Sequence, residues 1–174
     1  MSLQSACDET LKRMNRRYTI EQFIEIVHRL RKTYPDVNLT TDIIVGFPGE
    51  TQEEFNKTYE FLEQIKFYKM HIFKYSQRKG TKAAQMPDQI SPEVKEERSK
   101  KLINLSDKNE CEYNKKYIGK QVEVLWEEEK NGVYKGHTKN YVLVETHMDL
   151  DKNIENTIEK VKIVDAKEHY IIAE

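Results

Sequence analysis

The sequence predicts an α/β unit followed by a small all-β barrel, and three observations carry this prediction. In the first two thirds of the chain, apolar residues at helical spacing alternate with short β-branched runs. After residue 117 the hydrophobic period changes to two, which is typical of strands. The charge changes at the same place. Residues 1–116 carry 21 Lys+Arg and 18 Asp+Glu, residues 117–174 carry 8 and 12, and the resulting +3 and −4 sum to the overall −1.

Helices and strands are predicted in alternating order in the first part. Apolar residues at helical spacing begin at Ile20 and predict a helix that ends before the first proline. The run Leu39–Val45 predicts a strand, and Thr51 with Glu54 forms the capping-box pattern of a second helix. Lys69–Tyr75 predicts a second strand. This order of elements is typical of a parallel α/β sheet.

A long helix and several short strands are predicted in the second part. Ser91-Pro92-Glu93 places an N-cap, a proline and an acid at a helix start, and this helix should end near Tyr117, before Gly119. Asn131-Gly132 is a strong signal for a tight hairpin turn. Short alternating runs together predict a small antiparallel barrel, and they are Gln121–Trp126, Val133–Thr138, Tyr141–Thr146, Thr157–Val164 and Glu168–Ala173.

Composition narrows the class of protein. A length of 174 residues allows one ordinary domain or two small ones. No run approaches the ~18 apolar residues of a membrane span, and no signal-peptide core is visible, so we expect a soluble, cytoplasmic protein without a membrane partner. The cysteines Cys7 and Cys111 lie far from any second Cys or His at metal spacing, so no metal site is expected in this chain.

Two predicted strand ends lead into loops that could bind a ligand. Gly46-Phe47-Pro48-Gly49-Glu50 precedes a helix N-terminus, where free N–H groups attract anions. Taken alone, this pattern favours a turn that serves only the fold over a ligand site. Phe73–Thr81 lies at the end of the next strand and offers an Arg for carboxylate or phosphate together with aromatic faces for stacking. A basic surface loop with core aromatics would have the same sequence.

Basic residues are concentrated in two places. Ile65–Pro87 holds six Lys or Arg and no acid, and Lys12, Arg13, Arg16 and Arg17 form a second group. Such runs are as compatible with a solvated face as with a nucleic-acid surface.

Taken together, the order of these motifs resembles a known family. The chain resembles the C-terminal half of a radical SAM methylthiotransferase, closest to the branch that acts on N6-threonylcarbamoyladenosine in tRNA. Lys95-Glu96-Glu97-Arg98 and the β-rich tail resemble the family's connecting helix and its TRAM domain, a small RNA-associated β-barrel. The other matching segments are Ser2–Ser5, Asp8–Arg16, Thr41–Thr51, Tyr75-Ser76, Arg78 and Gly80-Thr81.

The resemblance implies a division of the chain and a set of cofactors. Residues 1–90 would be the C-terminal part of the radical SAM (β/α) barrel, residues 91–116 the connecting helix and residues 117–174 the TRAM-like barrel. The parent enzyme would use S-adenosyl-L-methionine and two 4Fe-4S clusters. The Cys-x-x-x-Cys-x-x-Cys loop that holds the catalytic cluster is not in this sequence. We therefore expect a fragment with no cluster, no catalytic residue of its own and no turnover.

The resemblance also implies site residues and partners. Adenosylmethionine would be held by residues from three segments, namely Ser5, Gly46, Phe47, Pro48, Gly49, Glu50, Phe73, Tyr75 and Arg78. Contacts to tRNA, the expected partner, are assigned to Lys74, Lys79, Lys82, Lys135 and Lys139. The alternatives are a fragment of a ribosomal-protein methylthiotransferase and a non-catalytic RNA-binding module. A partial barrel would also expose a strand edge that favours self-association.

Overall fold

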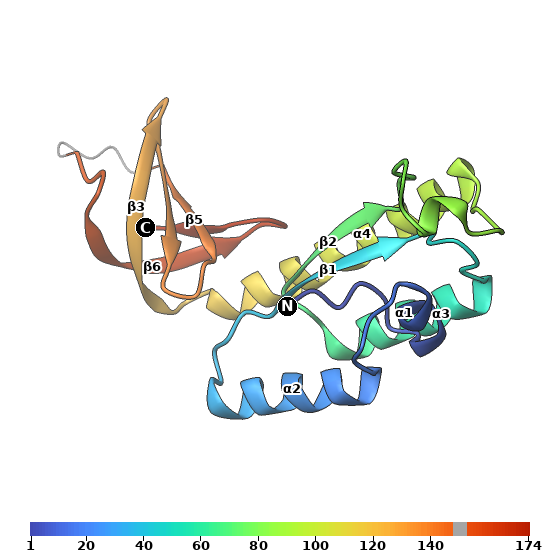
Figure 1. The fold of residues 1–174 in the computed structure, drawn as a ribbon. Helices are drawn as coiled ribbons and strands as arrows, with labels where there is room; N and C mark the ends of the chain where they lie inside the picture. The colour runs from blue at the N-terminus through green and yellow to red at the C-terminus, as the bar shows by residue number, and fades with distance from the viewer. Residues whose placement is uncertain (148–152) are drawn as a thin grey trace. The chain divides into compact units, whose positions relative to one another are not determined.

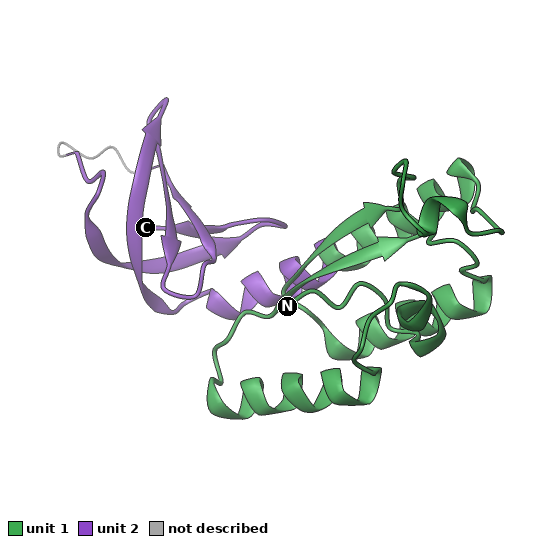
Figure 2. Cartoon of the chain, in the orientation of Figure 1, with its two compact units in different colours: residues 1–106 green, residues 107–174 purple. Residues whose placement is uncertain are grey.

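The computed structural model describes residues 1–147 and 153–174, which divide into two compact units. Unit 1 comprises Met1–Ser106 and unit 2 comprises Asp107–Glu174 (Figure 2). In the described part of the chain, no helix combines the length and the apolar character that a membrane crossing requires.

Unit 1 is built on a parallel strand pair, as the sequence predicts. Strands β1 and β2 pair in register from Thr40↔Lys69 to Val45↔Lys74, and Gln4 adds an isolated parallel bridge to Ile43 (Figure 1). The elements of this unit are α1 (Asp8–Arg13), α2 (Ile20–Thr33), β1 (Thr40–Val45), α3 (Gln52–Ile65), β2 (Lys69–Lys74), the 3-10 turn η1 (Ala83–Gln85) and most of α4 (Pro92–Asn114).

The core of unit 1 lies between one face of this sheet and the helices. Ile43 and Val45 of β1 are buried there with Val27 of α2, Leu62 of α3 and Leu102 of α4. Burial alternates along β1, so Asp42 and Ile44 face away from this core. One strand therefore packs one face on the core of the unit and turns the other face away from it, as the period of two along a strand requires.

Unit 2 is a closed barrel with the strand order β3-β4-β5-β7-β6. Its neighbouring strands are antiparallel with one exception, because β5 and β7 pair in parallel through Val144↔Ile171. The prediction of a barrel is confirmed, and its purely antiparallel character is wrong. The elements are η2 (Lys115–Tyr117), β3 (Gln121–Lys130), β4 (Val133–Thr138), β5 (Leu143–Thr146), β6 (Ile158–Ala166) and β7 (Ile171–Ala173).

Two features of the β3–β4 hairpin depend on glycine, namely its tight turn and the close approach of its strands. Asn131 and Gly132 both have positive φ, 55° and 77°, as the tight turn requires. Behind this turn, a Cβ on Gly136 would lie 2.2 Å from the carbonyl oxygen of Leu125, so only glycine allows the two strands to approach this closely. Trp126 is fully buried at the centre of the barrel. Tyr141 has φ 68° and lies in a turn, so the fifth strand starts at Leu143 rather than at Tyr141.

The boundary between the units falls inside α4 rather than at its end. The last turns of this helix contact the loop between β6 and β7. Asn114 Nδ2 donates to the carbonyl oxygens of Lys167 and Glu168, both at 3.2 Å. Glu110 is buried and pairs with Nδ1 of His169 at 3.0 Å. The helix expected to connect two domains therefore contributes its last third, from Asp107 to Asn114, to the packing of unit 2.

Candidate functional site

A cavity of about 560 Å³ opens at the carboxyl ends of β1 and β2 in unit 1. In parallel α/β folds, ligands bind at this edge because the loops that follow the strands converge there. The lining residues come from the segment before α1, from both strands and from the loops after them, and they are Gln4, Asp42, Ile44, Phe47, Phe73, Lys74, Tyr75, Ser76, Arg78, Thr81 and Ala83.

The aromatic wall of this cavity is formed by Phe47 and Tyr75. Their rings meet edge to face, with centroids 5.2 Å apart and planes at 68°. The strands bring them together, since the amide of Tyr75 donates to the carbonyl oxygen of Val45 at 2.9 Å. Lys95 of α4 donates from Nζ to the carbonyl oxygen of Tyr75 at 3.1 Å and lies over its ring. The hydroxyl of Tyr75 is buried and finds no hydrogen-bond partner within the described residues.

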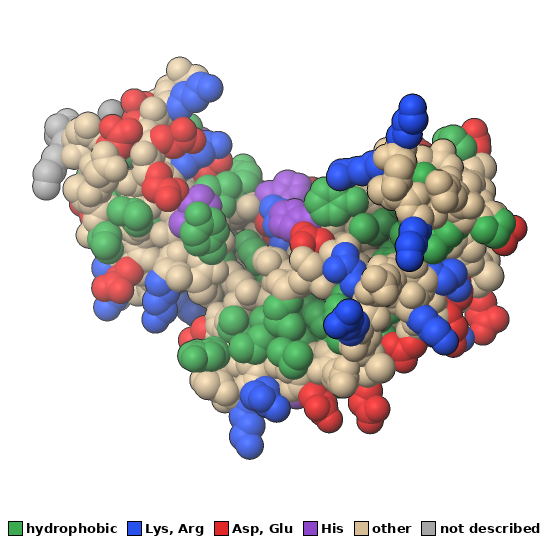
Figure 3. Space-filling model, in the orientation of Figure 1, with side chains coloured by type: hydrophobic (Ala, Val, Ile, Leu, Met, Phe, Trp, Pro, Cys, Tyr) green, Lys and Arg blue, Asp and Glu red, His purple; other side chains and the backbone are tan. Residues whose placement is uncertain are grey.

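The basic side of the cavity is formed by Lys74 and Arg78. Lys74 pairs with Glu96 of α4 at 2.8 Å, whereas the structure records no ion pair for Arg78 among the residues described. Lys79 and Lys82 are exposed in the same loop and do not line the cavity. In Figure 3, Lys and Arg side chains stand out around the part of unit 1 where β2 ends. Among the described residues, Arg78 is therefore a lining cation whose charge no recorded ion pair matches.

The loop Gly46–Glu50 contributes one residue, Phe47, to the lining of the cavity. Gly46 and Gly49 have positive φ, 70° and 76°, which explains why glycine stands at both positions. Phe47 reaches the cavity, while Gly46, Pro48, Gly49 and Glu50 do not line it. Glu50 turns back into the protein, where its Oε1 accepts from the amide of Gly46 at 3.0 Å and from Nη1 of Arg98 at 2.6 Å. Glu50 thus holds the loop together instead of facing a ligand.

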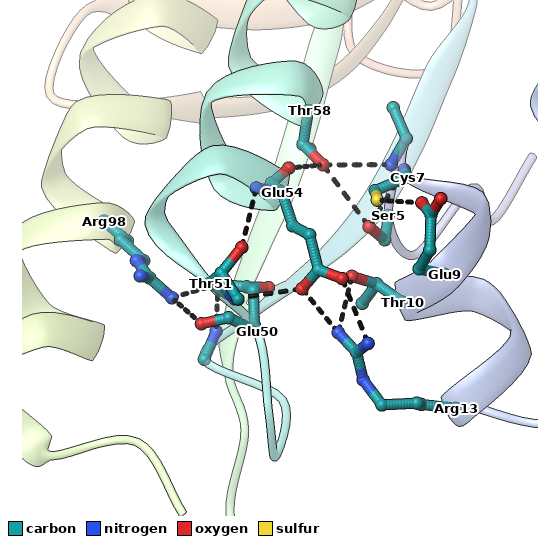
Figure 4. Close-up of polar contacts among 12 residues, drawn as sticks. Ser5, Cys7, Glu9, Thr10, Arg13, Glu50, Thr51, Glu54, Thr58 and Arg98 are labelled. Carbon is teal, nitrogen blue, oxygen red and sulfur yellow. Dashed lines mark hydrogen bonds and ion pairs between the residues drawn. The ribbon is translucent and has the colours of Figure 1, made fainter. Parts of the chain in front are cut away.

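A second set of polar contacts lies on the other side of this loop (Figure 4). Arg13 of α1 makes a two-point ion pair with Glu54 of α3, with Nη1 3.0 Å from Oε1. Although its burial would raise the pKa of Glu54, the guanidinium of Arg13 and the amide of Thr51 outweigh it and lower that pKa. Ser5, expected to hold the cofactor, is buried against Thr58 and does not line the cavity.

The basic residues of unit 2 are placed on the barrel surface. Lys135 pairs with Glu145 on the neighbouring strand at 2.8 Å, so its charge is already matched. Lys139 is exposed in the turn after β4, and the ring of Tyr141 stacks on His137 with centroids 4.7 Å apart. Tyr141 is 74% exposed, which leaves an aromatic face next to a lysine.

Two groups of potential metal ligands are found among the described residues, and the ligand atoms within each group lie within 4.8 Å of one another. Internal contacts account for much of each group. Cys7, Glu9 and Glu54 form one, and Asp107, Glu110 and His169 the other. Cys7 donates to Glu9 at 2.8 Å, and burial together with this bond raises the pKa of the thiol. A protonated thiol is a poor metal ligand, because the thiolate is the form that binds.

Several lining residues were not among the predicted site residues. Asp42 and Ile44 could have been found from the period of two along β1, which sends them to the face opposite the core. Gln4 lies within a segment that carries the family resemblance, but no local pattern assigns it to a site. Arg98 had no local signal either, because its partner Glu50 lies 48 residues earlier.

Comparison with known proteins places this strand-end cavity in context. Residues 1–62 match the family described as the radical SAM superfamily. The chain is 44% identical over 147 residues to the threonylcarbamoyladenosine tRNA methylthiotransferase MtaB of Bacillus subtilis, an alignment that covers 82% of this chain and 33% of that protein. These matches support the assignment of the chain to the radical SAM methylthiotransferase family.

Relatives from this family bear the names of two different tRNA modifications. The tRNA-2-methylthio-N(6)-dimethylallyladenosine synthase of Caldicellulosiruptor saccharolyticus is 37% identical over 176 residues, which is 100% of this chain and 37% of that protein. The synthase of the same name from Bacillus cytotoxicus is 44% identical over 170 residues, 96% and 33% respectively. The chain thus spans about a third of the length of these curated relatives, and similarity alone does not separate the two substrates.

Proposed function

We propose that this chain supplies the strand-end binding cavity of a tRNA-modifying radical SAM enzyme that methylthiolates C2 of N6-threonylcarbamoyladenosine. The observation that carries the proposal is the composition of the cavity. It combines the aromatic pair Phe47 and Tyr75 with an Arg78 for which no ion pair is recorded in the described residues. Aromatic faces suit an adenine, and a guanidinium suits the carboxylate of an amino acid.

The residues fit adenosylmethionine in one further respect. The buried hydroxyl of Tyr75 has no partner within the described part of the protein, and leaving such a group unpaired costs about 1–3 kcal/mol. A ribose or amino-acid group in the cavity would supply the missing hydrogen bond if binding moves the ring so that this buried hydroxyl reaches the ligand. When bound in the complete enzyme, the cofactor supplies the hydrogen-abstracting radical and the methyl group. The chain's own residues orient the adenine, pair the carboxylate and exclude water.

The residues do not fit an iron–sulfur cluster. One cluster requires at least three thiolates, and the sequence has two cysteines, of which Cys7 is buried and hydrogen-bonded to Glu9. We derive no step through a cluster, and we propose that this chain alone has no turnover. The proposed tRNA substrate would place the enzyme in the cytoplasm.

The choice of nucleoside rests on the charge of the cavity. A threonylcarbamoyl group ends in a carboxylate, whereas a dimethylallyl group is apolar and gains nothing from a guanidinium. Lys74 is already paired with Glu96, so Arg78 is the lining cation that would favour the threonylcarbamoyl substrate, provided that it does not pair with the carboxylate of adenosylmethionine. The dimethylallyl substrate is the second candidate, because Phe47 and Phe73 offer it an apolar surface. Mass spectrometry of tRNA nucleosides from cells that lack the gene separates the two, since only one methylthio nucleoside should disappear.

Exchange of Arg78 tests the role of the cavity. Arg78→Ala should weaken binding of the carboxylate-bearing ligand by about 10- to 150-fold, equivalent to ~1.5–3 kcal/mol for a charge-assisted hydrogen bond. Lys79→Ala is the matched control for adenosylmethionine binding, because Lys79 lies next to Arg78 but outside the cavity; it is no control for tRNA binding, since Lys79 is itself assigned to tRNA contact. Binding of adenosylmethionine and of tRNA should be measured separately for both variants. If Arg78→Ala and the wild type bound adenosylmethionine and tRNA with equal affinity, Arg78 would be an ordinary surface charge without a role in binding.

RNA contact by the barrel is a separate part of the proposal. Lys139 and the exposed face of Tyr141 support it, while the pairing of Lys135 with Glu145 and the net charge of −4 in residues 117–174 weaken it. A TRAM-like positioning role for the barrel would remain without RNA contact. If the complete enzyme bound no tRNA but modified a ribosomal protein, the alternative proposal, a ribosomal-protein methylthiotransferase, would be correct instead.

A further inference from the structure

Two cations in the first turns of α4, Lys95 and Arg98, bond the loops that follow β1 and β2. Lys95 bonds the carbonyl oxygen of Tyr75 at 3.1 Å, and its side chain crosses Gly46, where an added Cβ would lie 2.3 Å from its Cγ. One turn later, Nη1 of Arg98 bonds both the carbonyl oxygen of Glu50 at 3.0 Å and its Oε1 at 2.6 Å. Each cation therefore contacts a segment that also supplies an aromatic residue to the cavity wall.

The pair Arg98–Glu50 is buried, with side-chain exposures of 6% and 5%. Such a pair gains little net free energy over an apolar replacement, but removal of one partner leaves a buried charge uncompensated. Its geometry is directional, since a single guanidinium nitrogen bonds both the backbone and the side chain of Glu50. A lysine at this position would keep the charge but lose the second nitrogen, Nη2, which donates to Oε1 of Gln52 at 3.4 Å, and the planar guanidinium that lies over the ring of Phe55.

Glu50 transmits this constraint to the loop. Its carboxylate also accepts from the amide of Gly46, so the loop is closed into a ring between residues 46 and 50, with the amide of Glu50 bonded to the carbonyl oxygen of Phe47 at 2.9 Å. Figure 4 shows Arg98 approaching Glu50 from α4, on the side of the loop opposite Arg13. The ring fixes the backbone at Phe47 and with it the edge-to-face contact with Tyr75.

We infer that Arg98 is a positioning residue for the cavity, which holds Phe47 in its wall by clamping Glu50 and the loop Gly46–Glu50. The inference rests on the proposed function for the identity of the ligand, adenosylmethionine. It assigns a task to the connecting helix that differs from a link between domains. Lys95 acts in the same way on Tyr75, from the preceding turn of the same helix.

The glycines of the chain provide a direct measurement. The sequence has six, so a sample labelled with ¹⁵N-glycine gives six amide signals. Gly46 and Gly49 report on the loop, and Gly119, Gly132 and Gly136 report on unit 2. In the full chain with Arg98→Lys, the signals of Gly46 and Gly49 should shift or broaden, while the three signals of unit 2 should stay in place. Affinity for adenosylmethionine, measured by calorimetry, should fall about tenfold or more.

Two further variants complete the test. Arg98→Met should produce a larger change in the same two signals, because it leaves the buried Glu50 without a cation. Lys101→Met is the control, since Lys101 lies on the same helix and forms an exposed pair with Glu97. Unchanged loop signals in Arg98→Lys and Arg98→Met would overturn the inference, as would wild-type affinity with shifted signals. If the wild type bound no adenosylmethionine, the proposed ligand would be wrong, and the loop signals would still decide the role of Arg98.

Discussion

At the scale of single residues, Tyr75 carries the most direct consequence. Its hydroxyl has no partner among the described residues, so Tyr75→Phe should leave the free energy of unfolding unchanged or raise it by up to ~1 kcal/mol. Affinity for adenosylmethionine should fall by about 2- to 12-fold, because one hydrogen bond to the ligand is lost. Thermal unfolding and calorimetry measure the two effects. Tyr34→Phe, at an exposed tyrosine, is the control, and equal ligand affinity in both variants would contradict the expectation.

Glu50 should titrate above its ordinary range. Burial raises its pKa above 4.5, and this effect outweighs the amide of Gly46 and the guanidinium of Arg98, which act in the opposite direction. Arg13 and Glu54 are the other charged groups nearby. Because the folded state holds this proton more tightly than the unfolded state, the contribution of Glu50 to stability decreases as pH rises from 4.5 through the folded pKa. The amide shift of Gly46 should follow this titration, and a midpoint below 4.5 would refute it.

The residue scale also separates what sequence can and cannot predict. Thr51 and Glu54 lie three residues apart, and the reciprocal capping bonds expected for them are present at 3.1 and 2.9 Å. The pair of Glu50 and Arg98 joins a loop to a helix 48 residues later, and no local rule selects that partner. The sequence therefore predicts Glu50 as a ligand contact, whereas in the structure its carboxylate bonds the amide of Gly46 and the guanidinium of Arg98.

At the scale of elements, the β3–β4 hairpin offers a sharp test. Gly136→Ala would place a Cβ 2.2 Å from the carbonyl oxygen of Leu125, so the strands must separate, and we expect a loss of about 1–3 kcal/mol or more. Gly132→Ala is the comparison, since it meets no atom within 4 Å and is strained only by its φ of 77°, which costs about 1–2 kcal/mol. Trp126, the single tryptophan, reports unfolding of this unit by fluorescence in urea. A smaller loss for Gly136→Ala than for Gly132→Ala would contradict this ranking.

Element types followed from periodicity more readily than their pairing did. The structure confirms the predicted parallel pairing of β1 and β2. This pairing could be predicted because a helix connects the two strands, and such a crossover joins parallel strands. The parallel contact of β5 with β7 joins strands separated by β6, so neighbouring-strand reasoning misses it. Helix α1 was also missed, since its six residues are too few to show a helical period.

At the scale of the whole molecule, the position of the unit boundary predicts which piece folds. A chain of residues 107–174 retains Glu110 and Asn114, which contact His169 and the carbonyl oxygens of Lys167 and Glu168. A chain of residues 117–174 lacks these contacts and should unfold at lower temperature. Thermal melts of both, followed by the fluorescence of Trp126, measure the difference. Equal melting temperatures would show that the helical turns add nothing to the barrel.

The division into an α/β part and a β-rich part could be predicted from the change in periodicity, because each unit keeps one hydrophobic period. The place of the boundary could not, because the face of α4 that packs on the barrel is identified only by Asn114 and Glu110 meeting distant residues. Self-association through a free strand edge stays a prediction, and light scattering over a range of concentrations would test it.

The parallel contact between β5 and β7 has a consequence for synthesis on the ribosome. The barrel closes only when Ile171–Ala173 can insert between β5 and β6, so nearly all of unit 2 must emerge before its core is sealed. Unit 1 ends at Ser106 and is complete 68 residues earlier, which corresponds to roughly 3 to 14 s at 5–20 residues per second. During that interval a nascent chain would carry a finished cavity and an open barrel, and chaperones that recognise exposed apolar strands would find their target in the later half.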